Sequence, residues 1–268
     1  LVLNFSAVDL KKMKVSKLGV IIMLFQVIVS LMLYFIVNTL TSNEIIAQAL
    51  LLGVLCPVAA SVVVISSILG AKRTTTTSYT IYGNILVAIV APIYFSFIGT
   101  NQSLPFLESF WLILKKIAPV IAFPFFVVLL LQLLLPKVKE GISKFKDWAL
   151  ILWAFALFMS LGSTIDYIFR YHKGNEKTII WLAILSVILC GIQFGVGKLI
   201  GKKLGEKVAG GQLLGQKNIA VGIWMATVYL NPLTTVLLAF YSISQNLFNS
   251  WQMWYFEKKR KKEMVSRM

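Results

Sequence analysis

The chain has 268 residues, of which 58% are hydrophobic and only 13% are charged, and its mean hydropathy is +0.83. An average soluble domain carries roughly 25% charged residues, so this composition excludes an ordinary soluble protein and indicates one embedded in a membrane. The formal net charge of +16 suggests a nucleic-acid partner at first sight. No nucleic-acid reading motif accompanies the basic residues, so we expect no such partner.

Apolar runs of helix length follow one another along nearly the whole chain. A bilayer core about 30 Å thick takes about 20 apolar residues in a helix, so each run is long enough to cross it. We therefore predict an all-α membrane protein, a polytopic helical bundle of about eight spans in a single transmembrane domain covering residues 1–268. The predicted spans are residues 18–40, 45–70, 76–98, 112–135, 148–169, 179–200, 204–230 and 232–256.

Basic residues are distributed unevenly between the loops that join these spans. With the first loop taken as cytoplasmic, 19 of the 26 lysines and arginines fall on the inner side, three on the outer side and four within spans or at their edges. The positive-inside rule turns this bias into an orientation. We expect an integral protein of a bacterial inner membrane with both ends of the chain in the cytoplasm. The basic tail, residues 257–268, fits a stop signal near anionic lipid.

Two of the predicted spans are poor continuous helices. The span 45–70 contains Pro57, which removes a backbone donor in mid-span, and the span 204–230 contains GG followed by GQKN, with Gly215 just before the polar run. Both spans are predicted to break. The backbone groups freed by a break are tolerated at membrane depth only inside protein or facing water.

The two interrupted spans occupy corresponding positions in the two halves of the chain. The pattern of residues 18–98 recurs at residues 179–256, five spans later. Because five spans is an odd number, the two halves have opposite orientations in the membrane, as an inverted repeat requires. Such repeats are typical of secondary transporters, whose ligand sites lie at the half-helix ends. We therefore predict two broken helices that cross inside the bundle.

The second break places Gln216, Lys217 and Asn218 in a row where lipid is expected. A charged lysine near the bilayer centre costs about 3 kcal/mol on insertion scales, so Lys217 is a candidate functional residue. The alternative is a side chain that snorkels to the cytoplasm. Lys217 lies thirteen residues beyond Leu204, about 20 Å along a helix, which makes that reach long.

Two segments resemble the bile acid:sodium symporter family. They are VLCPVAASVVVISSILGAKRTTTTSYTIYGN, residues 54–84, followed by VAPIY, and LLGQKNIAVGIWMATVYLNPLTTVLLAFYSISQNLFNSW, residues 213–251. The first residues, LVLNFSAVDLKKMK, resemble the end of that family's second span and the loop after it. The resemblance implies ten spans in the family, a core of two broken-helix repeats, and a panel domain, here residues 112–169. It also implies that the first span and most of the second are missing from this sequence.

The resemblance assigns sodium ligands to positions where this chain has other residues. A Glu and a Gln of the family's ninth span align with Leu213 and Lys217, and the Asn of a Ser–Asn pair in its fourth span is absent near Ser61. All ten acidic residues map to loops or span ends, so no carboxylate is expected to offset the dehydration of a sodium ion at the midplane. We therefore expect no metal site and no cofactor.

Lys217 is expected to replace the missing cation. Its ammonium group would fill the space of a sodium ion and join the crossing helices through carbonyls and hydroxyls such as that of Thr80. Thr76, Thr80 and Asn84 match the hydroxyl ligands of the family's fifth span and are assigned to the same site.

Four residues are expected to contact substrate. Asn218 aligns with the family's substrate-facing Asn, Ser61 lies at the start of a half-helix, and Gln245 and Asn246 stand where the family's tenth span carries a His–Asn pair. Amides donate to a carboxylate or sulfonate as imidazole does. The alternative for Gln245 and Asn246 is hydrogen bonding between helices, which is common in membrane bundles.

These observations favour a secondary transporter of small organic anions, carboxylate or bile-acid-like, that works by alternating access without sodium. Its expected partners are the anion and the lipid bilayer. An enzyme is not expected, because the single histidine, His172, falls in a loop and no catalytic cluster is placed at depth. A non-transporting membrane sensor or partner subunit of the same fold is the alternative.

Overall fold

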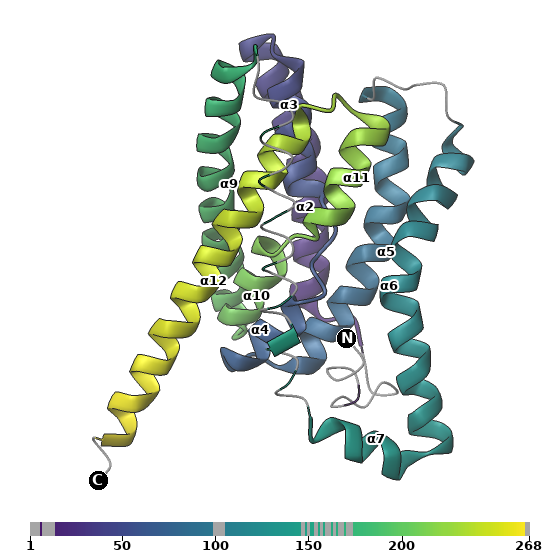
Figure 1. Cartoon of the computed structure of the whole chain (residues 1–268), viewed down its shortest axis with the longest axis vertical. Helices are drawn as coiled ribbons and strands as arrows, with labels where there is room; N and C mark the ends of the chain where they lie inside the picture. Colours follow the sequence, from purple (N-terminus) through teal and green to yellow (C-terminus); the bar gives the residue numbers. More distant parts are fainter. Residues whose placement is uncertain are drawn as a thin grey trace.

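The computed structural model describes residues 14–98, 105–145 and 174–265, with Ser6 and scattered residues between 148 and 169 outside these ranges. Within that part of the chain the regular structure is helical (Figure 1). Three of the described helices are long and apolar enough to cross a membrane: α2 (Lys17–Thr41), α5 (Arg73–Ile98) and α9 (Glu176–Lys203). The predicted all-α class is confirmed, and these helices indicate association with a membrane.

One face of α2 packs into the protein and the other carries apolar side chains outward. Its buried positions recur every four residues and are Leu18, Ile22, Gln26, Ser30 and Tyr34, with Gly19 beside the first. Residues on the opposite face, such as Leu24 and Phe35, are more than half exposed. An apolar face that is exposed all along a helix suits contact with lipid rather than with water.

Short polar residues end α2 and begin α3 (Glu44–Leu55). Ser42 adopts a left-handed conformation with φ 49° and its N–H donates to Asn38 O, which closes the last turn of α2. Asn43 then accepts a hydrogen bond from Ile46 N at 3.1 Å and so caps the first turn of α3. The chain therefore reverses within two residues, and α2 and α3 pack side by side.

Both predicted breaks are confirmed. The span 45–70 divides into α3 and the short α4 (Val62–Ile68), and the span 204–230 divides into α10 (Lys207–Gly215) and α11 (Ile219–Tyr229). Pro57 follows α3 directly and has no N–H to continue its hydrogen-bond ladder. The outer ends of these two predicted spans lie within three residues of the ends of the helices.

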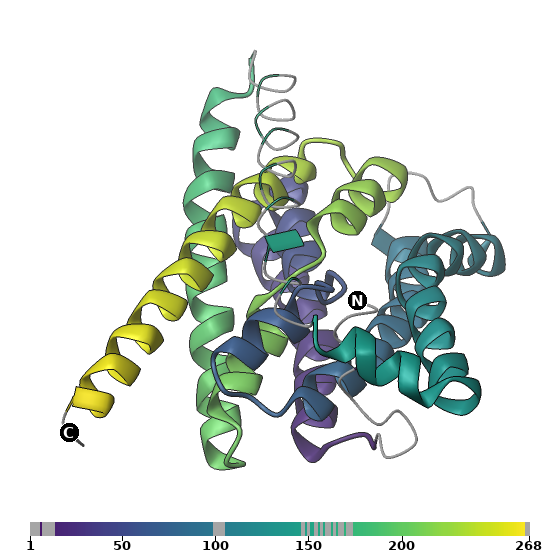
Figure 2. The ribbon, with the colours of Figure 1, turned by 60° about the horizontal axis from the view of Figure 1, so that its bottom comes forward.

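The remaining helices are α6 (Phe106–Leu134), α7 (Pro136–Ser143) and α12 (Thr234–Val265). Figures 1 and 2 both show α5 and α6 side by side on one flank of the molecule, and α12 crossing α9 and running past the bundle to the C-terminus. The half-helix α10 packs on α9 and also contacts α4, which in turn contacts α5. The predicted span 148–169 falls almost entirely outside the described residues.

Glycines allow α9 and α10 to approach closely. A methyl group added to Gly197 would meet the backbone carbonyl of Gly210, and one added to Gly210 would meet that of Gly197. Small residues are typical where membrane helices pack with their backbones in near contact. This packing fixes α10, and with it the second break, against a long apolar helix.

Candidate functional site

The two breaks cross as a short antiparallel pair. Val58 and Lys217 form an isolated antiparallel bridge. On either side of it, the N–H of Asn218 donates to Pro57 O at 2.7 Å and the N–H of Ala59 donates to Gln216 O at 3.3 Å. Backbone groups freed by one break are therefore satisfied by the other, which makes non-helical chain tolerable inside the bundle.

The end of α3 leaves four carbonyl groups without partners in the helix, as every helix end does. Side chains from elsewhere in the chain supply those partners. Gln193 Nε2 donates to Gly53 O at 3.2 Å, Lys217 Nζ to Val54 O at 2.6 Å, and Gln26 Nε2 to Leu55 O at 2.7 Å and to Cys56 O at 2.9 Å. The C-terminus of α3 is therefore capped by α2, by α9 and by the crossing itself.

Lys217 is buried at this crossing, with 1% of its surface exposed. Its backbone is also hydrogen-bonded: its N–H donates to Gln245 Oε1 at 2.8 Å and its carbonyl accepts from Gln245 Nε2 at 3.2 Å. The snorkelling alternative is wrong for this residue. Its amine is inside the protein, against the negative end of the α3 dipole, where a cation is stabilised.

Three residues of α5 were assigned to this site, Thr76, Thr80 and Asn84, and of these Asn84 is the one that hydrogen-bonds to the crossing. Thr80 Oγ1 donates to Thr76 O at 2.8 Å, Thr76 Oγ1 donates to Arg73 O at 3.1 Å, and both threonines are buried. The Lys217 amine therefore meets the expected type of carbonyl partner, Val54 O, and makes no hydrogen bond to Thr80, whose hydroxyl donates to the preceding turn of α5. Asn84 Nδ2 does reach across, to Val58 O at 3.4 Å.

The four expected substrate contacts separate into two groups. Ser61 Oγ donates to Gln216 Oε1 at 3.0 Å, and Asn218 Oδ1 accepts from Val221 N at 3.3 Å and caps α11. Both side chains are half-buried at the crossing. Gln245 is almost fully buried and is engaged with the backbone of Lys217, which is the helix-to-helix bonding left open as the alternative.

Asn246 lies further along α12. Its Nδ2 donates to Ser242 O at 2.8 Å, one turn back in the same helix, and the side chain is half-buried. The structure therefore places Ser61, Asn218 and Gln245 at the crossing and gives Asn246 a hydrogen bond within α12.

The end of α10 is capped by a residue that the sequence analysis did not single out. Tyr241 OH donates to Gly215 O at 2.8 Å and accepts from Gln193 Nε2 at 3.1 Å. Gln193 thus links the ends of both broken helices, since it also bonds Gly53 O. The signal available in the sequence was a glutamine inside an otherwise apolar span, which is costly unless its amide is paired.

No protein-family model matches the chain, and a comparison with curated proteins finds no match either. The resemblance to the bile acid:sodium symporter family therefore stays a prediction from the quoted segments. The crossing combines a buried amine with the N-termini of two half-helices.

Proposed function

We propose that the chain is a secondary transporter of small organic anions that works by alternating access. The observation that carries this proposal is the burial of Lys217 where two interrupted helices meet. Breaking two helices costs stability, and a lysine at membrane depth costs about 3 kcal/mol more. A protein that only needed a bundle would use continuous apolar helices, so this combination favours a ligand site.

The order of the described helices supports a pair of inverted repeats. A long helix, a broken helix and a second long helix follow one another as α2, α3 with α4, and α5, and again as α9, α10 with α11, and α12. The antiparallel bridge between Val58 and Lys217 is the contact expected where two such broken helices cross. In this proposal the repeats are residues 18–98 and 179–256, and residues 112–169 supply the panel against which they move.

The role proposed for Lys217 is that of a cation attached to the chain. Carbonyl oxygens at a helix end are ligands that a sodium ion would use, and here Val54 O binds the Lys217 amine at 2.6 Å. An ammonium group at this position supplies the positive charge that would otherwise have to be bound from solution. Transport in this proposal is uniport, exchange or coupled to protons, without sodium.

The substrate proposed is a carboxylate or sulfonate. The N-terminus of α11 carries a partial positive charge, and Asn218 stands at that end. Because Asn218 Oδ1 caps the helix, the NH₂ group is the part of its side chain that donates to an anion. Ser61 at the start of α4 lies across the crossing from it, hydrogen-bonded to Gln216.

Uptake into proteoliposomes tests the proposal. The purified chain is reconstituted, and entry of radiolabelled taurocholate and lactate is measured with sodium or choline outside. We expect saturable uptake of at least one probe at the same rate in both salts. The same uptake is expected to fall at least tenfold in Asn218→Ala and to stay unchanged in Asn38→Ala, an asparagine near the end of α2.

A second candidate is a non-transporting sensor or partner subunit. The observation that favours it is the internal bonding of the crossing, because Lys217, Gln245 and Ser61 all have partners within the chain. Such a protein would bind an anion without moving it. Anion binding to the purified chain with no uptake by proteoliposomes of the same preparation would select this candidate over the transporter.

A further inference from the structure

A basic cavity lies away from the crossing, between the Lys203 end of α9, the start of α10 and the last turns of α12. Its volume is about 680 Å³. Four cations line it, Lys198, Lys207, Lys259 and Arg260, against one carboxylate, Glu263, which leaves its wall with a net charge of +3. A concave wall with this charge favours an anion.

Two of these cations are brought together by the packing of α9 on α10. Lys198 lies inside the candidate span α9 and is half-buried, with its aliphatic stem against the backbone of Gly211. Lys207 opens α10 and lines the same cavity as Lys198. Two like charges held near each other in a fold are stabilised when an anion binds between them.

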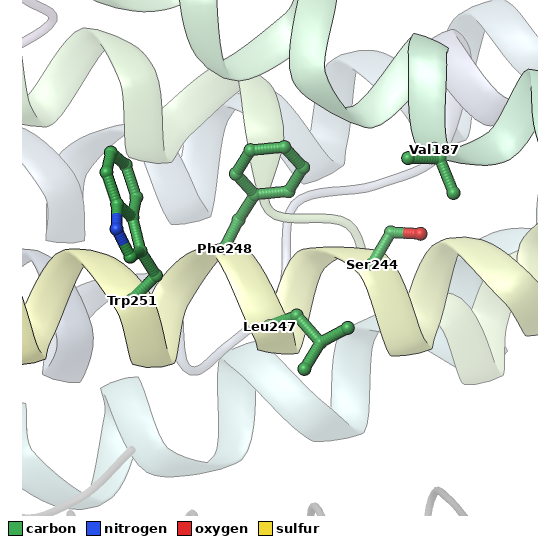
Figure 3. A pocket seen from close by; sticks show the side chains of 5 residues that line it. All are labelled: Val187, Ser244, Leu247, Phe248 and Trp251. Carbon is green, nitrogen blue, oxygen red and sulfur yellow. The ribbon is translucent and has the colours of Figure 1, made fainter.

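An apolar groove lies beside this cavity, along α12. It has a volume of about 360 Å³ and is lined by Val187 of α9 and by Ser244, Leu247, Phe248 and Trp251 of α12. Figure 3 shows Ser244, Phe248 and Trp251 on one side of α12, toward the helix that carries Val187. Trp251 lines both the groove and the basic cavity, so the two adjoin at this side chain.

The groove opens where lipid is expected. Val187, Leu247 and Trp251 are all more than half exposed, and α9 is one of the helices able to cross a membrane. Trp251 and Tyr255 stack on each other at the junction between the apolar groove and the basic cavity. Aromatic residues at such a junction are typical of the level of the lipid headgroups.

We infer that this cavity and groove together bind one anionic phospholipid, with its phosphate among Lys198, Lys207 and Arg260 and an acyl chain along Leu247 and Val187. The eight residues from Ser244 to Trp251 span about 10 Å of helix, enough for part of an acyl chain. A soluble phosphate would use the cations and leave the groove empty, so the groove assigns the ligand to the bilayer. This site is independent of the transport proposed above.

Binding of defined lipids to the purified full-length chain tests the inference. Native mass spectrometry in detergent gives the dissociation constants for palmitoyl-oleoyl phosphatidylglycerol and for the matching phosphatidylcholine. We expect one tight phosphatidylglycerol site. Because each lysine near a membrane surface contributes about 1 kcal/mol, Lys198→Gln with Lys207→Gln is expected to weaken that site about 30-fold.

The matched control removes the same charge from exposed lysines that do not line the cavity, Lys202→Gln with Lys203→Gln, and is expected to change the affinity less than twofold. Equal losses in the two double variants would overturn the inference, because they would show general attraction to the basic surface. Lys207→Gln alone, at an exposed side chain, keeps the test available if the double variant does not fold, with a loss of about fivefold expected.

A second arm tests the groove. Leu247→Trp fills it while keeping the surface apolar, and is expected to weaken phosphatidylglycerol at least fivefold while leaving the weak binding of glycerol 3-phosphate unchanged. Glycerol 3-phosphate that binds the wild-type chain as tightly as phosphatidylglycerol would contradict the assignment to lipid, as would an unchanged affinity of the Leu247 variant for phosphatidylglycerol.

Discussion

The amine nitrogen of Lys217 lies 2.6 Å from the carbonyl oxygen of Val54, in the last turn of α3. This contact joins the two interrupted helices through a side chain, next to the backbone bridge that already joins them. It places a potential positive charge at the negative end of a helix dipole, in a site that is closed to solvent. The proposed function depends on that charge.

Removing the amine tests the contact directly. Lys217→Met keeps most of the volume of the side chain and leaves Val54 O buried without a partner, which costs about 1–3 kcal/mol of unfolding free energy. We expect a lower thermal unfolding midpoint, followed by circular dichroism, and loss of anion uptake. Lys203→Met at an exposed position is the control. Wild-type stability and uptake in Lys217→Met would show that the amine is needed neither for the crossing nor for transport.

Tyr241 is expected to be as important as Lys217 for the stability of the crossing. Tyr241→Phe removes the donor to Gly215 O and the acceptor of Gln193 Nε2, so two buried polar groups lose a partner. We expect a loss of about 1–3 kcal/mol, read from the unfolding midpoint. Tyr255→Phe, at a residue more than half exposed, serves for comparison and should have no effect. Equal midpoints for both variants would contradict the assignment.

Gln245 and Asn246 are neighbours with different expected roles. Gln245→Ala leaves the N–H and the carbonyl of Lys217 without their side-chain partner, so we expect a lower unfolding midpoint with or without substrate. Asn246→Ala removes only a bond to the preceding turn of α12 and should change the midpoint little. A normal unfolding midpoint in Gln245→Ala, together with a raised KM for an anion, would indicate that Gln245 contacts the substrate.

The contact of α9 with α10 depends on the absence of side chains. In Gly197→Ala the new methyl group meets the Gly210 carbonyl, and such overpacking costs about 1–3 kcal/mol. In Gly195→Ala, two residues away on the same helix, the methyl group meets nothing within 4 Å. That change is expected to be neutral or to stabilise the helix by up to about 1 kcal/mol. Similar unfolding midpoints for the two variants would show that α10 is not packed as described.

The positions of the breaks were predictable because they depend on local backbone chemistry. Pro57 lacks an N–H, and Gly215 precedes three polar residues in an apolar segment. A few consecutive residues therefore determine each break. The burial of Lys217 was predictable for a similar reason, since its distance along the chain from the nearest span end makes escape to water difficult.

The partners at the crossing were not predictable, because they are far apart in the chain. Gln26 bonds Leu55 O across 29 residues, and Gln193 bonds Gly53 O across 140. Only the packing of α2 and α9 on α3 decides which carbonyl each amide meets. The carbonyl partner expected for Lys217 is present as Val54 O, but the Thr80 hydroxyl named beside it donates to Thr76 O in its own helix instead.

The central claim is that the Lys217 amine holds the crossing in place of a sodium ion. The most direct measurement is the thermal unfolding midpoint of the purified chain in 200 mM sodium chloride and in 200 mM choline chloride at the same pH, which needs no knowledge of the substrate. We expect equal midpoints for the wild type, and for Lys217→Gln as well, because Leu213 supplies no carboxylate. A midpoint several degrees higher in sodium, in either protein, would contradict it.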